Sequence, residues 1–356
     1  MKKILALLLA LIMCSFTFIG CDNAEDELGG YIGNYPETDE QIEKLTLNLY
    51  IITDDRTSDF AVTTVKRMVT QYTEQKFKTE LIVHYLKESE YDAKVLTAVT
   101  SNDKNSANIV LVNSPELMTQ LVNTKKLADL TVFLDDNDYK QYHSLNGSIP
   151  KPLLAGSKIG KNLYSIPNNH PIGEYKYLVI NKEMARDILK FSPEKLTSYK
   201  TLEDASELTE KISEYGKNPE DYVYYVSGNY GLRAEYEAEG NYCNVSVYPT
   251  VDENEAFSSA FAIVNKGQKY VERSMQIIYA INNDAYLRNL LQYGVEGTNY
   301  VVQNGDIKRV SSGENVYYMN INYTGDVFLA EYCSEIGWDK VSEENANNQN
   351  NQAVLK

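Results

Sequence analysis

The stretch LTLNLYIITDDRTSDFAVTTVKRMVTQYTEQKFKTELIVHYL, residues 45–86, decides the fold class of this chain of 356 residues. Its first eight residues alternate and are rich in strand-forming side chains, so they predict a β-strand. Apolar residues then recur at helical spacing over residues 61–72, and residues 57–59 can cap that helix. Residues 79–86 predict a second strand, so the folded part opens with a strand, a helix and a strand.

The same alternation continues along the next part of the chain. Residues 89–99 have the spacing of a helix, and NIVLVN, residues 108–113, is nearly continuously apolar, which predicts a strand buried on both faces. Residues 114–116 read Ser-Pro-Glu, which is typical of a helix start. Strands that alternate with helices predict an α/β fold, in which helices cover both faces of a parallel sheet.

Polar side chains follow the first and the third predicted strand. Ligands of open α/β sheets bind beyond the carboxyl ends of the strands. Asp54, Asp55 and Asn113 stand at such ends and are therefore candidate ligand-binding residues. Ordinary turn chemistry is the alternative explanation for each of them.

The N-terminal 20 residues have the composition of a secretory signal peptide. Two lysines precede a short apolar run that ends at Gly20, and this run is short for a membrane-spanning helix. Residues 18–21, Phe-Ile-Gly-Cys, resemble the lipobox of bacterial lipoproteins, with Phe18 where leucine is usual. The resemblance implies cleavage before Cys21 and a diacylglycerol on its thiol, which anchors such chains to the lipid bilayer on the outer face of the cell membrane. An ordinary signal peptide followed by a chance cysteine is the alternative.

Both ends of the mature chain are predicted to be unfolded. In the expected tether, residues 21–43, seven carboxylates and no Lys or Arg fall between residues 22 and 40, so the segment buries too little apolar surface to fold. The Asn/Gln-rich residues 343–356 are predicted to be a disordered tail. The formal net charge of −16 excludes nucleic acid as a partner, because phosphate backbones demand basic surfaces.

Four later segments resemble one protein family. GKNLYSIP, residues 160–167, and YLVINKE, residues 177–183, are similar to the GKLYGIP and YLLYYNKD segments of family 1 extracellular solute-binding proteins of ABC importers. TLED, residues 201–204, stands where that family has a helix start. LLQYGVEGTNYVV, residues 290–302, resembles the YGIEG motif of a lipoprotein subgroup, and residues 318–338 resemble the TGNVF segment that follows it.

This resemblance implies an α/β, two-lobed, periplasmic-binding-protein-like fold of type II, with discontinuous lobes and a hinge. We expect the first lobe at residues 44–166 and 260–308. We expect the second lobe at residues 167–259 and 309–342. The second lobe should be small, because many relatives carry a longer insertion in it.

The resemblance also implies capture of a small solute, most often a sugar or an oligosaccharide, for the permease subunits of an ABC importer. Candidate ligand-binding residues near the crossover between the lobes are Asn168, Asn169, Tyr175 and Tyr177. Tyrosine suits such a site because it offers an apolar face and a polar tip, and the chain has 29 tyrosines against one tryptophan. Arg233 is a further candidate in the second lobe, and an exposed arginine without a ligand is the alternative.

Two other function classes remain open. A lipoprotein of the same fold can instead present its ligand to a membrane sensor kinase, and the sequence does not separate this role from import. A glycosidase needs two carboxylates held about 5 to 9.5 Å apart across a sugar, and no active-site motif of that kind is recognisable. We therefore expect no catalytic residues.

Cysteines and histidines are too few and too scattered to predict a metal site, and no motif predicts a cofactor. His84, His143 and His170 have no Cys or His neighbour at ligand spacing. Cys243 and Cys333 permit a disulfide outside the cell, and two independent buried thiols are equally compatible with the sequence.

Overall fold

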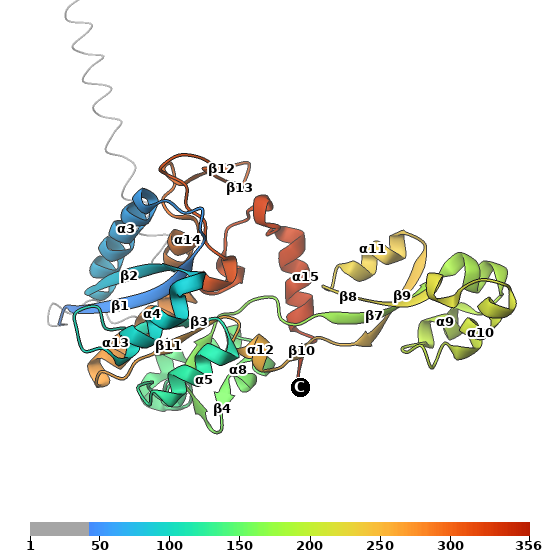
Figure 1. Ribbon diagram of the computed structural model, residues 1–356, viewed down its shortest axis with the longest axis horizontal. Coiled ribbons are helices and arrows are strands. Elements are labelled where there is room, and N and C mark those ends of the chain that lie inside the picture. The colour runs from blue at the N-terminus through green and yellow to red at the C-terminus, as the bar shows by residue number, and fades with distance from the viewer. Residues whose placement is uncertain (1–42) are drawn as a thin grey trace, which may run out of the picture. The chain divides into compact units, whose positions relative to one another are not determined.

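The computed structural model describes residues 43–356, so the predicted signal peptide, Cys21 and nearly all of the tether lie outside the described residues. The expected alternation of strands and helices at the start of the folded part is confirmed (Figure 1). It runs β1 (Leu45–Thr53), α3 (Asp59–Phe77), β2 (Thr79–Lys87), α4 (Glu88–Thr100), β3 (Ile109–Val112) and α5 (Pro115–Asn123).

A five-stranded sheet is the centre of the first lobe, with the strand order β2-β1-β3-β11-β6. β6 is Ser165–Pro167 and β11 is Ala260–Ile263. β1 pairs in parallel with β2 and β3, whereas β11 runs antiparallel to β3 and β6. Every residue of β3 and β11 is buried, as the continuous apolar pattern of β3 predicts for a strand covered on both faces.

Local signals in the sequence set several helix ends. Ser58 and Ser114 cap α3 and α5, because each side chain accepts a hydrogen bond from the backbone N–H three residues later. α13 (Gln268–Ile281) and α14 (Ala285–Tyr293) follow β11, and α14 packs against α3. α14 ends at Gly294, as the sequence predicts, and the φ of 79° at this residue suits glycine.

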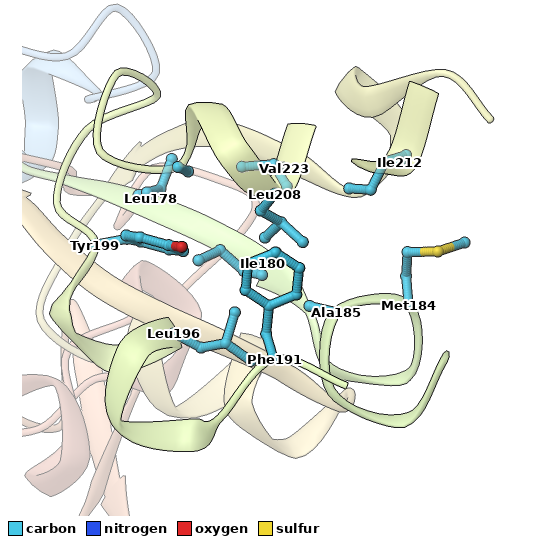
Figure 2. Close-up of a cluster of buried hydrophobic side chains, with 11 residues drawn as sticks. Leu178, Ile180, Met184, Ala185, Phe191, Leu196, Tyr199, Leu208, Ile212 and Val223 are labelled. Atoms are coloured by element: carbon cyan, nitrogen blue, oxygen red, sulfur yellow. The ribbon is translucent and has the colours of Figure 1, made fainter. Parts of the chain in front are cut away.

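The second lobe is built on a three-stranded antiparallel sheet with the order β8-β7-β9. These strands are β7 (Tyr175–Asn181), β8 (Val223–Gly228) and β9 (Asn241–Val247). Alternate residues of β7 enter different clusters. Leu178 and Ile180 face a mainly aliphatic core, called the aliphatic core below, which includes residues of α9 (Pro193–Ser198) and α10 (Ser206–Glu214) and the rings of Phe191 and Tyr199, as Figure 2 shows.

Shorter elements complete the described residues. The α-helices are α6 (Thr131–Asp135), α7 (Leu145–Ser148), α8 (Lys151–Gly156), α11 (Leu232–Ala238), α12 (Glu253–Ala256) and α15 (Lys340–Asn350). The short strands are β4 (Lys158–Ile159), β5 (Asn162–Leu163), β10 (Thr250–Val251), β12 (Tyr300–Gln303), β13 (Asp306–Arg309) and β14 (Val354–Leu355). A π-helix spans Glu183–Ile188, and 3-10 helices span Asn137–Tyr142, Pro219–Asp221, Ile321–Thr324, Val327–Leu329 and Ser334–Ile336. No helix among these residues is long and apolar enough to cross a membrane.

The C-terminal residues are folded, so the prediction of a disordered tail at 343–356 is wrong. Asp339 and Ser342 form a capping box at the start of α15, and the strand β14 that follows pairs with β10. Gln349 is 3% exposed and donates to the carbonyls of Ile172 and Gly173. Composition alone failed here because the helix is stabilised by tertiary contacts rather than by its own propensity.

Residues 309–342 also differ from their expected place in the second lobe. Many of their hydrogen bonds run to elements of the first lobe. The fully buried Arg288 of α14, for example, donates to the carbonyls of Ile321 and Asp326. The hydroxyl of Tyr317 likewise donates to the carbonyl of Leu291, at 2.7 Å. The segment therefore packs on α14 before it reaches α15.

Candidate functional site

The carboxyl ends of four strands meet at one edge of the first-lobe sheet. The pairing register aligns the ends of β1 and β2, and it aligns the ends of β3 and β6 with the start of β11. Thr53 is the last residue of β1, and Asn113 and Asn168 directly follow β3 and β6. The sheet therefore gathers polar side chains at the edge where α/β folds bind their ligands.

Three side-chain oxygens at this edge are buried without a hydrogen-bond partner in the described part of the chain. They are Thr53 Oγ1, Asn113 Oδ1 and Asn168 Oδ1. The amide nitrogen of Asn168 is fixed, since it donates to Ser259 Oγ at 2.9 Å and to the carbonyl of Asn322 at 3.3 Å. A buried acceptor without a donor costs about 1 to 3 kcal/mol.

A pocket of about 370 Å³ adjoins the end of β1, and its lining includes Thr53, Asp54, Arg56, Arg309 and Tyr323. Arg56 donates to both carboxylate oxygens of Asp54, at 2.7 Å each, and this guanidinium holds the pKa of Asp54 below its ordinary value. The Asp54 carboxylate is therefore ionised at neutral pH. The pair offers hydrogen-bond acceptors and donors side by side, in a pocket of the size that small ligands fill.

The ring of Tyr318 orders the two arginines of this pocket. The Cζ atoms of Arg56 and Arg309 lie 4.2 Å and 4.1 Å from the centroid of the ring. The Arg309 side chain is only 7% exposed, and its Nε donates to Glu335 at 3.1 Å. Ring contacts and ion pairs restrict both guanidinium groups, so the donors of the pocket are placed before any solute binds.

Tyrosines gather on one face of the second-lobe sheet. The ring of Tyr175 stacks on that of Tyr177 with centroids 5.2 Å apart, and it lies 6.0 Å from Tyr230 and 6.1 Å from Tyr248. Burial raises the pKa of Tyr175 to about 12, and its hydroxyl has no partner among the described residues. Tyr248 is 49% exposed, so this tyrosine cluster offers one ring on which the C–H face of a sugar can stack.

The structure divides the residues expected at the site. Asp54, Asn113 and Asn168 come together at the first-lobe edge, and of these three residues Asp54 lines the pocket. Tyr175 and Tyr177 belong to the separate tyrosine cluster.

Three other expected residues lie outside both groups. Asp55 and Arg233 are exposed, and each forms a surface ion pair, with Lys87 and Glu237 respectively. For Arg233 this is the surface alternative named above. Asn169 is buried, and its side chain contacts the C-terminal helix α15 instead of the first-lobe pocket.

Several residues of the site were missed by the sequence analysis. Arg56 lies within the polar turn that was noted only as a turn, next to the two aspartates that were selected. Arg309, Tyr318 and Tyr323 are more than 250 positions away from Asp54, so no local pattern connects them with it. Tyr248 follows β9 and carries no signal beyond the general abundance of tyrosine.

Cys243 and Cys333 are free and buried, so the disulfide that the sequence permits does not form. Cys243 packs against Tyr175 and Tyr177 in the second lobe, whereas Cys333 packs in a different cluster, with Tyr293 and Tyr300. No group of three or more His, Cys, Asp or Glu side chains that could hold a metal ion occurs within residues 43–356.

Comparison with known proteins identifies the fold. No protein-family model matches the chain, and no curated protein matches it. Among solved structures, the N-glycan transport solute binding protein NgtS from Streptococcus pneumoniae matches with a TM-score of 0.56 and 15% identity, over 88% of this chain and 84% of that one. The complex of the same protein with Man5GlcNAc matches with a TM-score of 0.55 and 15% identity, over 88% and 83%.

The fold is the two-lobed α/β fold of solute-binding proteins. This confirms the expected fold class. At this level of identity the likeness concerns the fold alone, so the function rests on the chemistry of the two residue groups described above.

Proposed function

We propose that the chain is a membrane-anchored extracellular lipoprotein that captures a small solute, a sugar or an oligosaccharide, for an ABC importer. The observation that carries this proposal is the first-lobe pocket, where the Asp54–Arg56 pair and Arg309 lie beside Thr53 at the end of β1. Placed donors and acceptors of this kind suit the hydroxyl groups of a sugar. The likeness to NgtS, whose solved structures include complexes with Man1GlcNAc and Man5GlcNAc, supports the same solute class.

The proposed mechanism is capture, closure about the hinge and handover to the permease, with no bond chemistry. Asp54 accepts hydrogen bonds from solute hydroxyls, and Arg309 donates to solute oxygens. Tyr248 packs its exposed ring against the apolar face of a sugar. Tyr175 and Tyr177 hold that ring in place from beneath, through the contacts of the tyrosine cluster.

The decisive experiment is a thermal-shift screen of the purified protein against neutral sugars, oligosaccharides, amino acids and peptides. A solute that binds only the folded state stabilises it by RT ln(1 + [L]/Kd), about 2.7 kcal/mol at a hundredfold excess over Kd. For a chain of this size each kcal/mol raises the melting temperature by about 2 to 4 °C. We expect sugars to raise it by several degrees. A panel that produces no shift at all overturns the proposal.

A pair of variants then locates the site. Asn113→Ala combined with Tyr323→Phe removes polar groups of the first-lobe edge, and we expect it to weaken binding at least about tenfold. Arg233→Ala is the matched control, because this side chain is exposed, forms its ion pair with Glu237 of the same helix and does not line the first-lobe pocket. Equal binding by both variants contradicts the assignment of the site. Hydrolysis of any glycoside by the pure protein favours the glycosidase alternative.

The membrane anchor and the partner need tests of their own. The proposed lipidation of Cys21 predicts that mass spectrometry of membrane fractions finds a diacylglyceryl group there, and that Cys21→Ser lacks it. A free thiol at Cys21 in the wild type contradicts the anchor. Loss of solute uptake on gene deletion supports an importer, whereas normal uptake with loss of a transcriptional response supports the sensor.

A further inference from the structure

The helix α15 is made of residues that favour helices poorly. Four of its eleven residues are asparagines, and the sequence NANNQN closes the helix. Asparagine disfavours helix interiors because its side chain competes for the backbone hydrogen bonds. The helix is fixed at its start by the Asp339–Ser342 capping box, and Ala346 packs beside Trp338.

Two of the amide side chains at the end of this helix have a structural role. Gln349 donates to the carbonyls of Ile172 and Gly173 and accepts from the backbone N–H of Tyr230 at 3.0 Å. Asn350 accepts from the backbone N–H of Ile172 at 3.0 Å and donates to the carbonyl of His170 at 2.8 Å. These bonds satisfy backbone N–H and carbonyl groups of the segment that crosses from β6 to β7. The structural role of Gln349 and Asn350 therefore explains why both residues stand at these positions.

Asn347 and Asn351 have no such role. Both side chains are exposed, and neither forms a side-chain hydrogen bond or ion pair within residues 43–356. They stand one helical turn apart, so they lie on the same face of the helix. Asn347 lies within the helix and Asn351 is its C-cap, and polar residues that return no structural contact are the ones to examine for a function.

The face that carries them lines a cavity of about 450 Å³. Across the cavity lie Asn146 and Ser148 of α7 and Lys151 of α8, and Asn169 of the crossover segment lies in the same lining. This asparagine cavity shares no lining residue with the first-lobe pocket. It therefore stands apart from the site assigned above.

The lining has a distinct chemistry. Side-chain amides supply a donor and an acceptor each, and amides dominate the polar lining. No carboxylate lines the cavity, although the chain has a net charge of −16, and Lys151 is its one charged residue. Such a lining pairs with groups that both donate and accept, such as hydroxyl and acetamido groups, and it offers no carboxylate to a cationic ligand.

We propose that the asparagine cavity is a second solute site, which binds an uncharged, hydroxyl-rich ligand such as a neutral disaccharide through Asn347 and Asn351. This site goes beyond the proposed function, because it neither uses nor requires the first-lobe pocket. A ligand held there contacts α15 on one side and α7 with α8 on the other. It also lies against Asn169 and Asn350, which bond to each other at 3.3 Å.

The test is calorimetric titration of the full-length protein with N,N'-diacetylchitobiose, mannobiose and cellobiose, each up to the millimolar range. The variant Asn347→Ala with Asn351→Ala removes both free amides, and Asn348→Ala is the matched control, because Asn348 is exposed on the same helix and outside the cavity lining. We expect a binding event that the control retains and that the double variant weakens at least about tenfold. Replacing Asn347 by alanine favours the helix, and the Asn351 side chain, at the C-cap position, forms no hydrogen bond within residues 43–356, so the double variant should fold about as well as the wild type.

The outcomes separate this site from the proposed function. If Asn113→Ala with Tyr323→Phe removes one event and the double asparagine variant removes another, both sites exist. If the double asparagine variant binds every probe as the control does, or if no probe shows an event that depends on it, the second site is overturned. In that case an event that depends on Asn113 and Tyr323 still supports the first.

Discussion

The central strands of the first-lobe sheet are buried on both faces, whereas the second-lobe sheet has a mainly aliphatic cluster on one face and the tyrosine cluster on the other. β3 and β11 are wholly buried, so the centre of the first sheet presents polar groups at strand ends, where Thr53, Asn113 and Asn168 lie. β7 instead alternates, with Leu178 and Ile180 in the aliphatic core and Tyr175 and Tyr177 in the tyrosine cluster. The two lobes therefore supply different chemistry: amides, hydroxyls and charges from strand ends, and aromatic surface from a sheet face.

The difference extends to how each lobe is held together. The first lobe gains further support from residues 309–332, which return to pack on α14. The second-lobe core is split by its three strands into two small clusters, the aliphatic core (Figure 2) and the tyrosine cluster. A small core has fewer neighbours that can compensate for a lost side chain, so the second lobe should be the more easily unfolded of the two.

The largest expected effect comes from Leu178→Ala in the aliphatic core of the second lobe. Leu178 is fully buried, and its truncation should lower the free energy of unfolding by about 3 kcal/mol, because a cavity remains. Hydrogen exchange should accelerate in β7, β8 and β9 and stay slow in β1 and β3. Val302→Ala, at an exposed position of β12, is the control. Equal acceleration in both sheets shows that the lobes unfold as one unit and breaks the comparison.

Gln349→Ala should have the next largest effect, because it removes hydrogen bonds to three backbone groups around the crossover and the second lobe. We expect a loss of about 2 kcal/mol, measured by urea unfolding. Gln352→Ala, an exposed position beyond the helix, should change little. If both variants unfold at the same urea concentration, the crossover does not depend on α15.

Asp326 makes the stability depend on pH. Burial raises the pKa of Asp326 to about 6, although Arg288 and His170 oppose this shift. The folded state then binds the proton more tightly than the unfolded state, so the free energy of unfolding falls as pH rises from about 4 to about 6. Asp326→Asn should lack this fall, which we expect to be about 1 to 2 kcal/mol.

Melting curves at about pH 4 and about pH 7 test this expectation, with Asp55→Asn as an exposed control. The stability of the first lobe should depend on pH, because the segment that packs on α14 carries the buried carboxyl of Asp326. The stability of the aliphatic core of the second lobe should not depend on pH. Parallel pH profiles for wild type and Asp326→Asn exclude Asp326 as the responsible group.

The smallest effect is expected from Arg233→Ala. Its ion pair with Glu237 joins exposed side chains one turn apart on α11, and such pairs contribute about 0.3 to 0.5 kcal/mol. Solute affinity and melting temperature should therefore stay close to wild type. A large loss of affinity would falsify the surface assignment and extend the solute site onto α11.

Much of the fold could be predicted from the sequence where local signals are strong. The apolar run of β3, the serine caps of α3 and α5 and the glycine that ends α14 each act over a few residues, and all of them were recognised. Only part of the candidate site could be predicted from the sequence. Strand ends pointed to Asp54 and Asn113, but Tyr318 and Arg309 meet Arg56 through tertiary packing alone.

The C-terminal helix shows why composition misled. An Asn/Gln-rich segment has weak intrinsic helix propensity, and a reading based on propensity predicts disorder. Gln349 and Asn350 are ordered by backbone groups of residues 170–173, whose positions no local pattern reveals. For the same reason the place of residues 309–342 was wrong, since it depends on hydrogen bonds to the buried Arg288.

The two buried thiols make the folded part of the chain suitable for spin labelling. Burial raises the pKa of Cys243 to about 11 and also raises that of Cys333, so neither ionises at neutral pH and both should resist thiol reagents. Cysteines introduced at the exposed positions Lys94 and Arg233 would then take nitroxide labels without removal of the native pair. Distances between such labels, measured by pulsed electron resonance with and without solute, would report the movement of the second lobe against the first.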